Sequence, residues 1–258
     1  MSFEKEFPAV PKALVDILKR IPKAALGFSG GVDSSYLLYA AKTCGVEIRG
    51  YYAKSQFQPQ FELDDARKIA KQVGADIKVL AIDALSNDRV KENPADRCYH
   101  CKRVIFSRIL DEAKADGYTL LVDGSNASDD AGDRPGMRAL TELKVISPLR
   151  EAGLSKDEIR EYSREAGLFT WNKPAYACLA TRIPTGRALD NEILYKVEQA
   201  ENKLFEMGFT DFRARVLGDA AKLQLPKNQI LKAAQQHSEL VEALSPWFSD
   251  VLLDLKPR

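Results

Sequence analysis

A short segment rich in glycine and serine, SGGVDSS at residues 29–35, is the part of the chain best suited to hold a phosphate. It lies between a predicted strand and a predicted helix, where unpaired N–H groups and the helix dipole favour an anion. Glycines let the backbone close around phosphate oxygens, and serines can donate hydroxyl groups. The residues concerned are Ser29, Gly30, Gly31, Ser34 and Ser35. Asp33 can bind the Mg²⁺ that accompanies a nucleotide, although an ordinary capped turn is the alternative.

Polar side chains also follow two other predicted strands. Lys54 comes after the strand at 46–53, and an acidic loop, DGSNASDD, begins at the end of the strand at 118–124. Because open parallel sheets bind ligands outside the carboxyl ends of their strands, we expect these segments to share one site with the glycine loop. For the acidic loop, a solvated turn is the alternative. The further nucleotide-binding candidates are Lys54, Asp123, Gly124, Asn126, Asp130 and Arg134.

The four cysteines, Cys44, Cys98, Cys101 and Cys178, are the second source of reactivity. They are too few for a disulfide scaffold, and Cys98 and Cys101 form a CxxC pair. Such a pair suits a redox site, a zinc site or an iron–sulfur cluster, with Cys178 as a further ligand. Inert, buried thiols are the remaining alternative. Cys44, inside a predicted helix, is interpreted as a core residue.

The elements that must position these groups alternate along the first part of the chain. Strands are predicted in the apolar run that ends at Phe28 and at 46–53, 77–82, 118–124 and 145–149. Helices are predicted at 11–21, from the glycine loop to Gly45, and at 61–73, 102–116 and 155–167. This alternation predicts an α/β fold, in which a parallel sheet is covered by helices on both faces.

The alternation stops at about residue 185. A helix at 189–207, strands near 212–217 and 222–225, a helix at 226–244 and a strand at 250–255 follow. We therefore predict two domains, 1–185 and 186–258, of which the second is a small α+β domain that binds substrate or makes oligomer contacts.

The composition is that of an ordinary globular protein, with 45% hydrophobic and 29% charged residues. A net charge of +1 argues against binding nucleic acid as the main activity. No apolar run approaches the ~20 residues of a membrane span, and the N-terminus lacks a secretory signal core. We therefore expect a cytoplasmic protein without a membrane partner.

Four segments together resemble the LarE family of sulfur transferases, within the PP-loop ATP pyrophosphatases. They are SGGVDSS, DGSNASDDAGDRPG, KPAYACLATRIPTG and FRARVLGD. The resemblance covers nearly the whole chain and implies a fold like that of the adenine nucleotide alpha hydrolases. It implies an enzyme that uses ATP and Mg²⁺ to adenylate a carboxylate of pyridinium-3,5-biscarboxylic acid mononucleotide, releasing pyrophosphate. Sulfur then displaces AMP to give a thiocarboxylate, in the biosynthesis of the nickel-pincer nucleotide cofactor of lactate racemase.

The sulfur source that the resemblance implies depends on the cysteines. In sacrificial members, the cysteine that matches Cys178 gives up its own sulfur. Cys98 and Cys101 are additional here and resemble the branch in which three cysteines hold a 4Fe–4S cluster. Such a cluster passes on sulfide, taken from solution or from a sulfur-delivery protein, and the chain survives. We favour the cluster and keep a sacrificial Cys178 as the alternative.

The resemblance also implies residues for the substrate. Arg213 and Arg215, which alternate on a predicted strand, would hold its phosphate, and Glu201 would bind metal or substrate. A solvated surface charge is the alternative for each. Arg182 follows Cys178 by four residues and would favour its thiolate if the two side chains lie close together.

The family resemblance implies homo-oligomers, such as hexamers. Three other functions fit parts of the sequence. They are a tRNA thiolase, an amide-forming ATP pyrophosphatase and a non-catalytic module that binds adenine nucleotides. The first is disfavoured by the near-neutral charge, and the other two leave the cysteines without a purpose.

Overall fold

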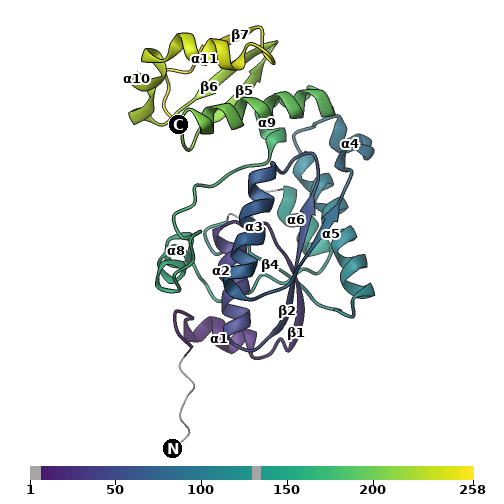
Figure 1. The fold of residues 1–258 in the computed structure, drawn as a ribbon. Helices are drawn as coiled ribbons and strands as arrows, with labels where there is room; N and C mark the ends of the chain where they lie inside the picture. Colours follow the sequence, from purple (N-terminus) through teal and green to yellow (C-terminus); the bar gives the residue numbers. More distant parts are fainter. Residues whose placement is uncertain (1–6, 130–134) are drawn as a thin grey trace, which may run out of the picture. The chain divides into compact units, whose positions relative to one another are not determined.

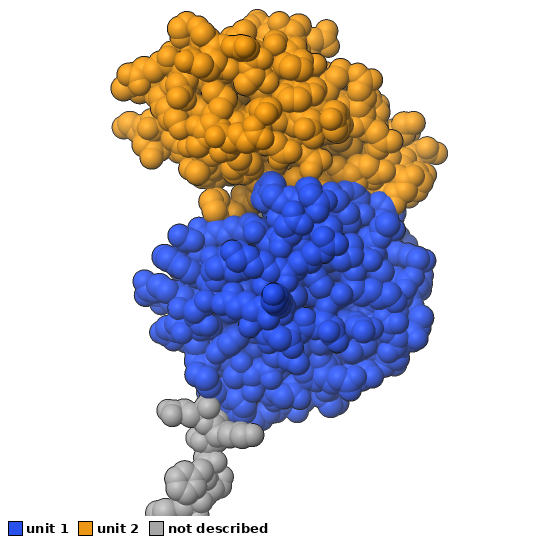
Figure 2. All heavy atoms as spheres, in the orientation of Figure 1, with its two compact units in different colours: residues 1–55, 60–82, 96–173 blue, residues 56–59, 83–95, 174–258 orange. Residues whose placement is uncertain are grey.

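The computed structural model describes residues 7–129 and 135–258. The chain divides into two compact units (Figure 2). Unit 1 consists of residues 1–55, 60–82 and 96–173, and unit 2 consists of residues 56–59, 83–95 and 174–258. The segment that carries Cys178 therefore belongs to unit 2. The domain boundary that the sequence suggests, between residues 185 and 186, stays a prediction.

Unit 1 is built on a four-stranded, all-parallel sheet (Figure 1). Its strands are β1 (Lys23–Gly27), β2 (Glu47–Lys54), β3 (Ile77–Ala81) and β4 (Leu121–Asp123), in the order β3-β2-β1-β4. The chain adds β2 and β3 on one side of β1 and β4 on the other, so the winding reverses between β1 and β4. In open parallel sheets, ligands bind at such a switch point, outside the carboxyl ends of the strands.

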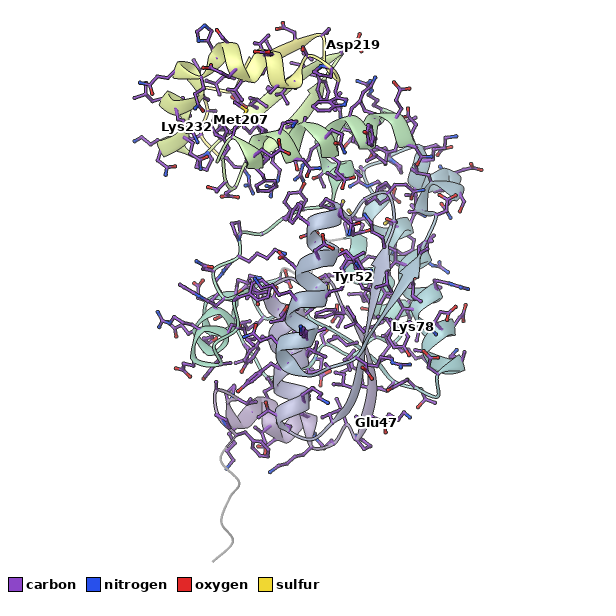
Figure 3. All side chains as sticks on the ribbon, viewed as in Figure 1. Glu47, Tyr52, Lys78, Met207, Asp219 and Lys232 are labelled. Atoms are coloured by element: carbon purple, nitrogen blue, oxygen red, sulfur yellow. The ribbon has the colours of Figure 1, made fainter. Side chains whose placement is uncertain are left out.

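Helices cover both faces of this sheet, because successive strand residues point to opposite sides. Tyr52, which is labelled in Figure 3, and Leu26 belong to the core shared with α1 (Lys12–Leu18), α2 (Val32–Thr43), α3 (Gln60–Val73) and α8 (Lys156–Glu165), whereas Ala25 and Tyr51 face α5 (Arg97–Ala115). The predicted α/β fold is therefore confirmed. The helices of unit 1 are α1 (Lys12–Leu18), α2 (Val32–Thr43), α3 (Gln60–Val73), α5 (Arg97–Ala115), α6 (Pro135–Glu142), α7 (Pro148–Glu151) and α8 (Lys156–Glu165).

Two predictions for unit 1 are wrong. The fifth strand at 145–149 is a single bridge between Val122 and Ile146, because Pro148 begins α7 directly afterwards. The CxxC pair was expected to precede its helix, but it lies in the first turns of α5, which begins at Arg97. No proline or glycine follows Arg97 within the next turns, so nothing in the sequence delays the helix.

Unit 2 contains a three-stranded mixed sheet. β5 (Arg213–Leu217) pairs antiparallel with β6 (Ala220–Gln224), which pairs parallel with β7 (Asp250–Leu253). Lys232 donates to the carbonyls of Met207 and Gly208 and so ties α10 (Lys227–Gln235) to the end of α9 (Asn191–Glu206) (Figure 3). The helices and 3₁₀ turns of unit 2 are η1 (Ala84–Ser86), α4 (Asp88–Lys91), η2 (Leu179–Arg182), α9 (Asn191–Glu206), α10 (Lys227–Gln235) and α11 (His237–Leu244).

The helix predicted at 226–244 is in fact two helices. The backbone leaves the helical region at Gln236, which ends α10 and begins α11, and this break lets α11 pack against α9 and β7. The sequence has no proline or glycine at the break, which is why the pattern looked continuous. Over the described ranges, none of the helices combines the length and the apolar character needed to cross a bilayer.

Candidate active site

The loop after β1 has a conformation that demands glycine at its second position. Gly30 has a φ of +70°, and a Cβ there would lie 2.8 Å from the Cβ of Ala66 on α3. Gly31 is the N-cap of α2, so the first N–H groups of that helix stand at the loop. A glycine turn in front of a helix N-terminus is an arrangement that binds anions.

Two of the three loop serines pair through their hydroxyl groups. The Oγ atoms of Ser29 and Ser34 lie 3.0 Å apart, and the Ser29 N–H donates to Ser34 Oγ at 3.3 Å. The Gly31 N–H donates to Ser29 Oγ at 3.4 Å. Ser34 and Ser35 are both buried, at 4% and 0% exposed, but the Ser35 hydroxyl has no hydrogen-bond partner within the described ranges. Ser29 and Ser34 therefore stand at the loop, and Ser35 is enclosed in the unit.

The turn after β4 packs directly against this loop. A Cβ on Gly124 would lie 2.8 Å from the backbone nitrogen of Ser34, so a larger residue would push the two segments apart. The side-chain amide of Asn126 donates to Asp33 Oδ1 at 3.3 Å. Because β1 and β4 are neighbours, the structure brings these two sequence-predicted loops together, with Asp33 between them.

The other predicted nucleotide residues have different surroundings. The Asp123 carboxylate accepts from the hydroxyls of Ser125 and Ser147, each at 2.6 Å, and so holds the turn in shape. Lys54 ends β2, where its carbonyl accepts from the Ile82 N–H. The last two candidates, Asp130 and Arg134, lie outside the described residues.

Sequence reasoning missed Lys156, which pairs with the central aspartate. Its Nζ lies 2.5 Å from Asp33 Oδ2, and its backbone N–H donates to Ser128 Oγ at 3.0 Å. Lys156 is the first residue of α8, directly after the Ser155 cap that the sequence did predict. Its ammonium group can neutralise a phosphate, or it can hold Asp33 until Mg²⁺ arrives.

Lys102 is a second cation that the sequence reasoning missed. Burial lowers the pKa of its ammonium group below the usual 10.5, against the opposing charges of Asp123 and Asp129. Its stem packs closely on the start of α6, since a Cβ on Gly136 would lie 3.0 Å from Lys102 Cδ. The position of Lys102, one residue after the CxxC pair, could have indicated that it lies at the site.

None of the four cysteines, all of them described, is joined in a disulfide. Cys98 and Cys101 lie three residues apart on α5 and so share one face of the helix, in unit 1, whereas Cys178 belongs to unit 2. Over residues 7–129 and 135–258, no group of three or more His, Cys, Asp or Glu side chains is placed to hold a metal. Cys44 packs against the main core, as predicted, and burial raises the pKa of its thiol.

In unit 2, a buried carboxylate gathers several polar groups. Glu201 on α9 accepts from Arg182 Nε at 2.8 Å and Nη2 at 3.0 Å, from the Ala214 N–H at 3.0 Å, and from the Tyr176 hydroxyl. A carboxylate has about four acceptor positions. These hydrogen bonds therefore occupy the positions that a bound metal or substrate would need at Glu201.

Arg213 and Arg215 share one face of β5, as the alternation predicted. Arg213 Nη2 donates to the Ala175 carbonyl at 2.6 Å, and Arg215 Nη1 donates to the Thr181 carbonyl at 3.0 Å. Burial, aided by the charge of Arg182, lowers the pKa of Arg213 to about 10, so its guanidinium stays charged at neutral pH. Arg213 Nη1 also donates to the Phe212 carbonyl at 2.6 Å, and neither arginine forms an ion pair with a carboxylate of the described residues.

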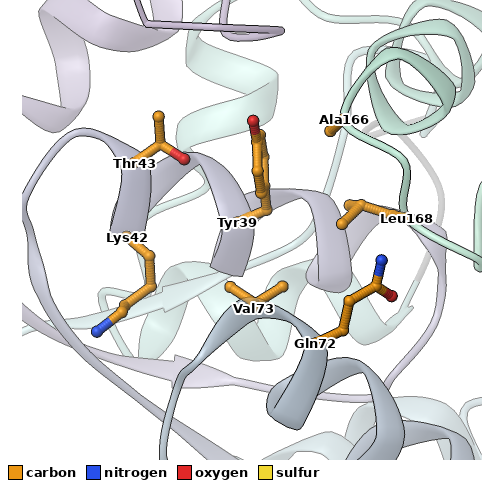
Figure 4. A pocket seen from close by; sticks show the side chains of 7 residues that line it. All are labelled: Tyr39, Lys42, Thr43, Gln72, Val73, Ala166 and Leu168. Carbon is orange, nitrogen blue, oxygen red and sulfur yellow. The ribbon is translucent and has the colours of Figure 1, made fainter.

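A separate hollow in unit 1 has a volume of about 310 Å³ (Figure 4). Two of its polar side chains are engaged, since the Tyr39 hydroxyl donates to the Pro8 carbonyl and the Gln72 amide to the Gly167 carbonyl. It lies at the C-terminal end of α2, whereas the glycine loop lies at the N-terminal end of that helix. The hollow is therefore separate from the candidate site. It is lined by Tyr39, Lys42, Thr43, Gln72, Val73, Ala166 and Leu168.

Comparison with known proteins shows to which family the chain belongs. No protein-family model matches it. It is 33% identical over 219 residues to the pyridinium-3,5-bisthiocarboxylic acid mononucleotide synthase of Lactiplantibacillus plantarum, which covers 84% of this chain and 79% of that protein. The chain belongs to the LarE family. The resemblance drawn from its motifs is thereby confirmed, and so is the prediction of an enzyme that transfers sulfur.

Two further relatives set this LarE-family chain in a wider group. An uncharacterised protein of Synechocystis is 34% identical over 240 residues, covering 92% of this chain and 90% of that protein. A tRNA-specific 2-thiouridylase of Clostridium botulinum is 27% identical over 236 residues, covering 76% of this chain and 64% of that protein. The second likeness agrees with a PP-loop fold and with the use of ATP and Mg²⁺.

Proposed function

We propose that this LarE-family chain converts a carboxylate of pyridinium-3,5-biscarboxylic acid mononucleotide to a thiocarboxylate, in the biosynthesis of the nickel-pincer nucleotide. A carboxylate oxygen attacks the α-phosphate of ATP, and pyrophosphate leaves. Sulfide then attacks the acyl carbon, and AMP leaves with the transferred oxygen. The observation that carries the proposal is the glycine loop at the switch point between β1 and β4, in a chain 33% identical to a synthase of this kind.

The surroundings of the glycine loop support the adenylation step. Backbone N–H groups at the start of α2 and the hydroxyls of Ser29 and Ser34 suit the phosphates of ATP. Asp33 provides a carboxylate for Mg²⁺ once Lys156 releases it. Positive charge from Lys156 and Lys102 stabilises the leaving pyrophosphate, where negative charge builds up.

Two arginines of unit 2 support a substrate that carries a phosphate. Arg213 is 6% exposed and lacks an ion-pair partner among the described carboxylates, so a phosphate would supply its missing counterion. Arg215 is exposed on the same face of β5. Planar guanidinium groups suit the paired oxygens of a phosphate.

The sulfur source that we favour is a 4Fe–4S cluster held by Cys98, Cys101 and Cys178. The chemistry of the donors suits such a cluster, because thiolates are its usual ligands and none of the three cysteines is in a disulfide, although the described residues do not group the three thiols around one metal position. When bound, a cluster with three protein ligands leaves one iron open to sulfide. The alternative is that Cys178 gives up its own sulfur. Assembly of the chain into homo-oligomers, a sulfur-delivery partner and a cytoplasmic location are parts of the same proposal.

An assay of both half-reactions tests the proposal. The purified chain is incubated with ATP, Mg²⁺, the dicarboxylate mononucleotide and sulfide, and pyrophosphate and the sulfur-containing product are measured by mass spectrometry. We expect both products from the wild type. The proposal fails if pyrophosphate is never released in the presence of the mononucleotide.

The variant Asp33→Asn examines the site in the same assay. We expect pyrophosphate release to fall about 100-fold, because the amide no longer binds Mg²⁺. Asp157→Asn, on the exposed surface of α8 beside Lys156, is the matched control and should retain wild-type activity. Equal activity of the two variants would remove Asp33 from the proposed site.

A further inference from the structure

Among the ion pairs of the described residues, the most enclosed joins Arg182 to Glu201. Their side chains are 0% and 1% exposed. Tyr176 adds to the pair, because its hydroxyl donates to Glu201 and its ring lies 4.6 Å from the guanidinium carbon of Arg182. Burial would lower the pKa of Arg182, but hydrogen bonds to Glu201 and the charge of that carboxylate outweigh it and raise the pKa. The guanidinium is therefore a fixed and permanently charged group.

The remaining nitrogen of this guanidinium, Nη1, faces the backbone that carries Cys178. It donates to the Ala177 carbonyl at 2.7 Å and to Thr181 Oγ1 at 2.9 Å, and it lies 3.4 Å from the Cys178 carbonyl. The hydroxyl and the N–H of Thr181 donate to the same Cys178 carbonyl, at 2.8 and 2.9 Å. The backbone on both sides of Cys178 is thus fastened to one buried side chain.

We propose that Arg182, held in turn by Glu201 and Tyr176, is a positioning residue that fixes the Cys178 turn for sulfur transfer. The pair could have been a mere core contact. However, a simple core contact would not need a charged guanidinium whose third nitrogen donates to the backbone carbonyls of Ala177 and Cys178. A nucleophile or ligand on a loop needs such support, because small displacements from the reacting geometry cost large factors in rate. The inference rests on the proposed role of Cys178.

Two conservative variants test this inference. Arg182→Lys keeps the charge but lacks the branched donors that reach Glu201 and the turn together. Tyr176→Phe removes only the hydroxyl that steadies Glu201, and it serves if Arg182→Lys fails to fold. Arg187→Lys is the matched control, because Arg187 is exposed and donates to the distant Gly218 carbonyl.

Hydrogen exchange measured by mass spectrometry reports the turn directly. The N–H groups of Leu179 and Thr181 are bonded to the carbonyls of Phe57 and Cys178, so both should exchange slowly in the wild type. In Arg182→Lys we expect their exchange to rise at least about tenfold, because hydrogen bonds to a charged group are lost. Peptides from β7 and the control variant should not change. An unchanged turn in both test variants would overturn the inference.

The ratio of the two reaction products gives the second readout. We expect Arg182→Lys to keep its pyrophosphate release and to lose at least about tenfold of its sulfur-containing product. A proportional loss of both products would show a general structural effect and refute a positioning role. If the wild type forms no sulfur-containing product, the proposed function fails, and hydrogen exchange alone then decides whether Arg182 fixes the turn.

Discussion

Gly30 meets two demands at once, and the two can be separated by experiment. Its φ of +70° strains any other residue, and its missing Cβ leaves room for Ala66. Gly74 has a similar φ of +66°, but nothing lies within 4 Å of its missing Cβ. The two glycines therefore share the backbone demand and differ in the steric one.

We expect Gly74→Ala to cost about 1–2 kcal/mol of unfolding free energy, the price of a left-handed residue with a side chain, and to leave ATP binding intact. Gly30→Ala should lose at least about tenfold in ATP affinity as well, because Ala66 pushes the loop out of shape. Urea unfolding and calorimetric titration with ATP measure the two effects. Equal ATP affinities for the two variants would contradict a phosphate-binding loop.

The residues of the candidate site differ in how far the sequence could predict them. Gly30 and Asp33 stand in a contiguous motif, so their types and spacing were sufficient. Lys102 and Lys156 were missed, because a lysine is common on any surface and only the folded chain brings these two beside Asp123 and Asp33. The four hydrogen bonds that the Glu201 carboxylate accepts likewise depend on tertiary packing.

At the scale of elements, the start of α8 controls the direction of a charged group in the site. Ser155 and Glu158 form a capping box, in which Ser155 Oγ accepts from the Glu158 N–H and the Glu158 carboxylate accepts from the Ser155 N–H at 2.8 Å. This cap fixes where the helix begins and thus where Lys156 points. Hydrogen bonds from the Ser155 hydroxyl and N–H hold the pKa of Glu158 below its usual 4.5.

We expect Ser155→Ala to lower the unfolding free energy by about 1 kcal/mol near neutral pH. A lowered carboxyl pKa stabilises the fold above the unfolded value of 4.5, and this contribution disappears as the pH falls through the folded pKa. The gap between wild type and variant should therefore shrink in acid. Urea unfolding at neutral and acidic pH measures it, and Ser155→Thr should restore the wild-type value. A gap that stays constant with pH would exclude the Glu158 carboxylate from the cap.

The secondary structure was largely predictable where local pattern decides it. The strand at 46–53 and the helix at 61–73 match β2 and α3 within a residue or two, because apolar periodicity marks them clearly. The error at 145–149 arose because a short apolar run can be a strand or a connector, and Pro148 decides for the connector. The end of α10 at Gln236 was missed, because no proline or glycine marks it in the sequence.

At the scale of the whole molecule, each compact unit consists of segments that are not consecutive in the chain. Residues 83–95 join the C-terminal segment in unit 2 through Asn93, whose side-chain amide donates to the carbonyls of Pro184 and Arg187. The sequence predicted a simple division into two consecutive parts. Pairings between segments about 90 residues apart are not visible in local periodicity, and this one needs a buried asparagine with φ of +55°.

The iron content of the full-length protein tests the proposed sulfur source. Anaerobic reconstitution of the full-length protein with iron and sulfide should give a brown protein with about four irons per chain. Cys98→Ser and Cys178→Ser should each lose most of this iron, since each removes one of three proposed thiolates. Cys44→Ser is the control, because Cys44 packs against the core of unit 1, and its iron content should equal that of the wild type.

The outcomes separate the two sulfur sources. Iron that persists in Cys178→Ser would mean that the third ligand is another group. A colourless wild type that still forms the sulfur-containing product would rule out the cluster. In that case Cys178 is the expected donor, and the peptide that contains it should lose the mass of one H₂S after a single turnover. An unchanged peptide mass in an iron-free, active protein would exclude both sources, because the product's sulfur would then come from sulfide acting without either.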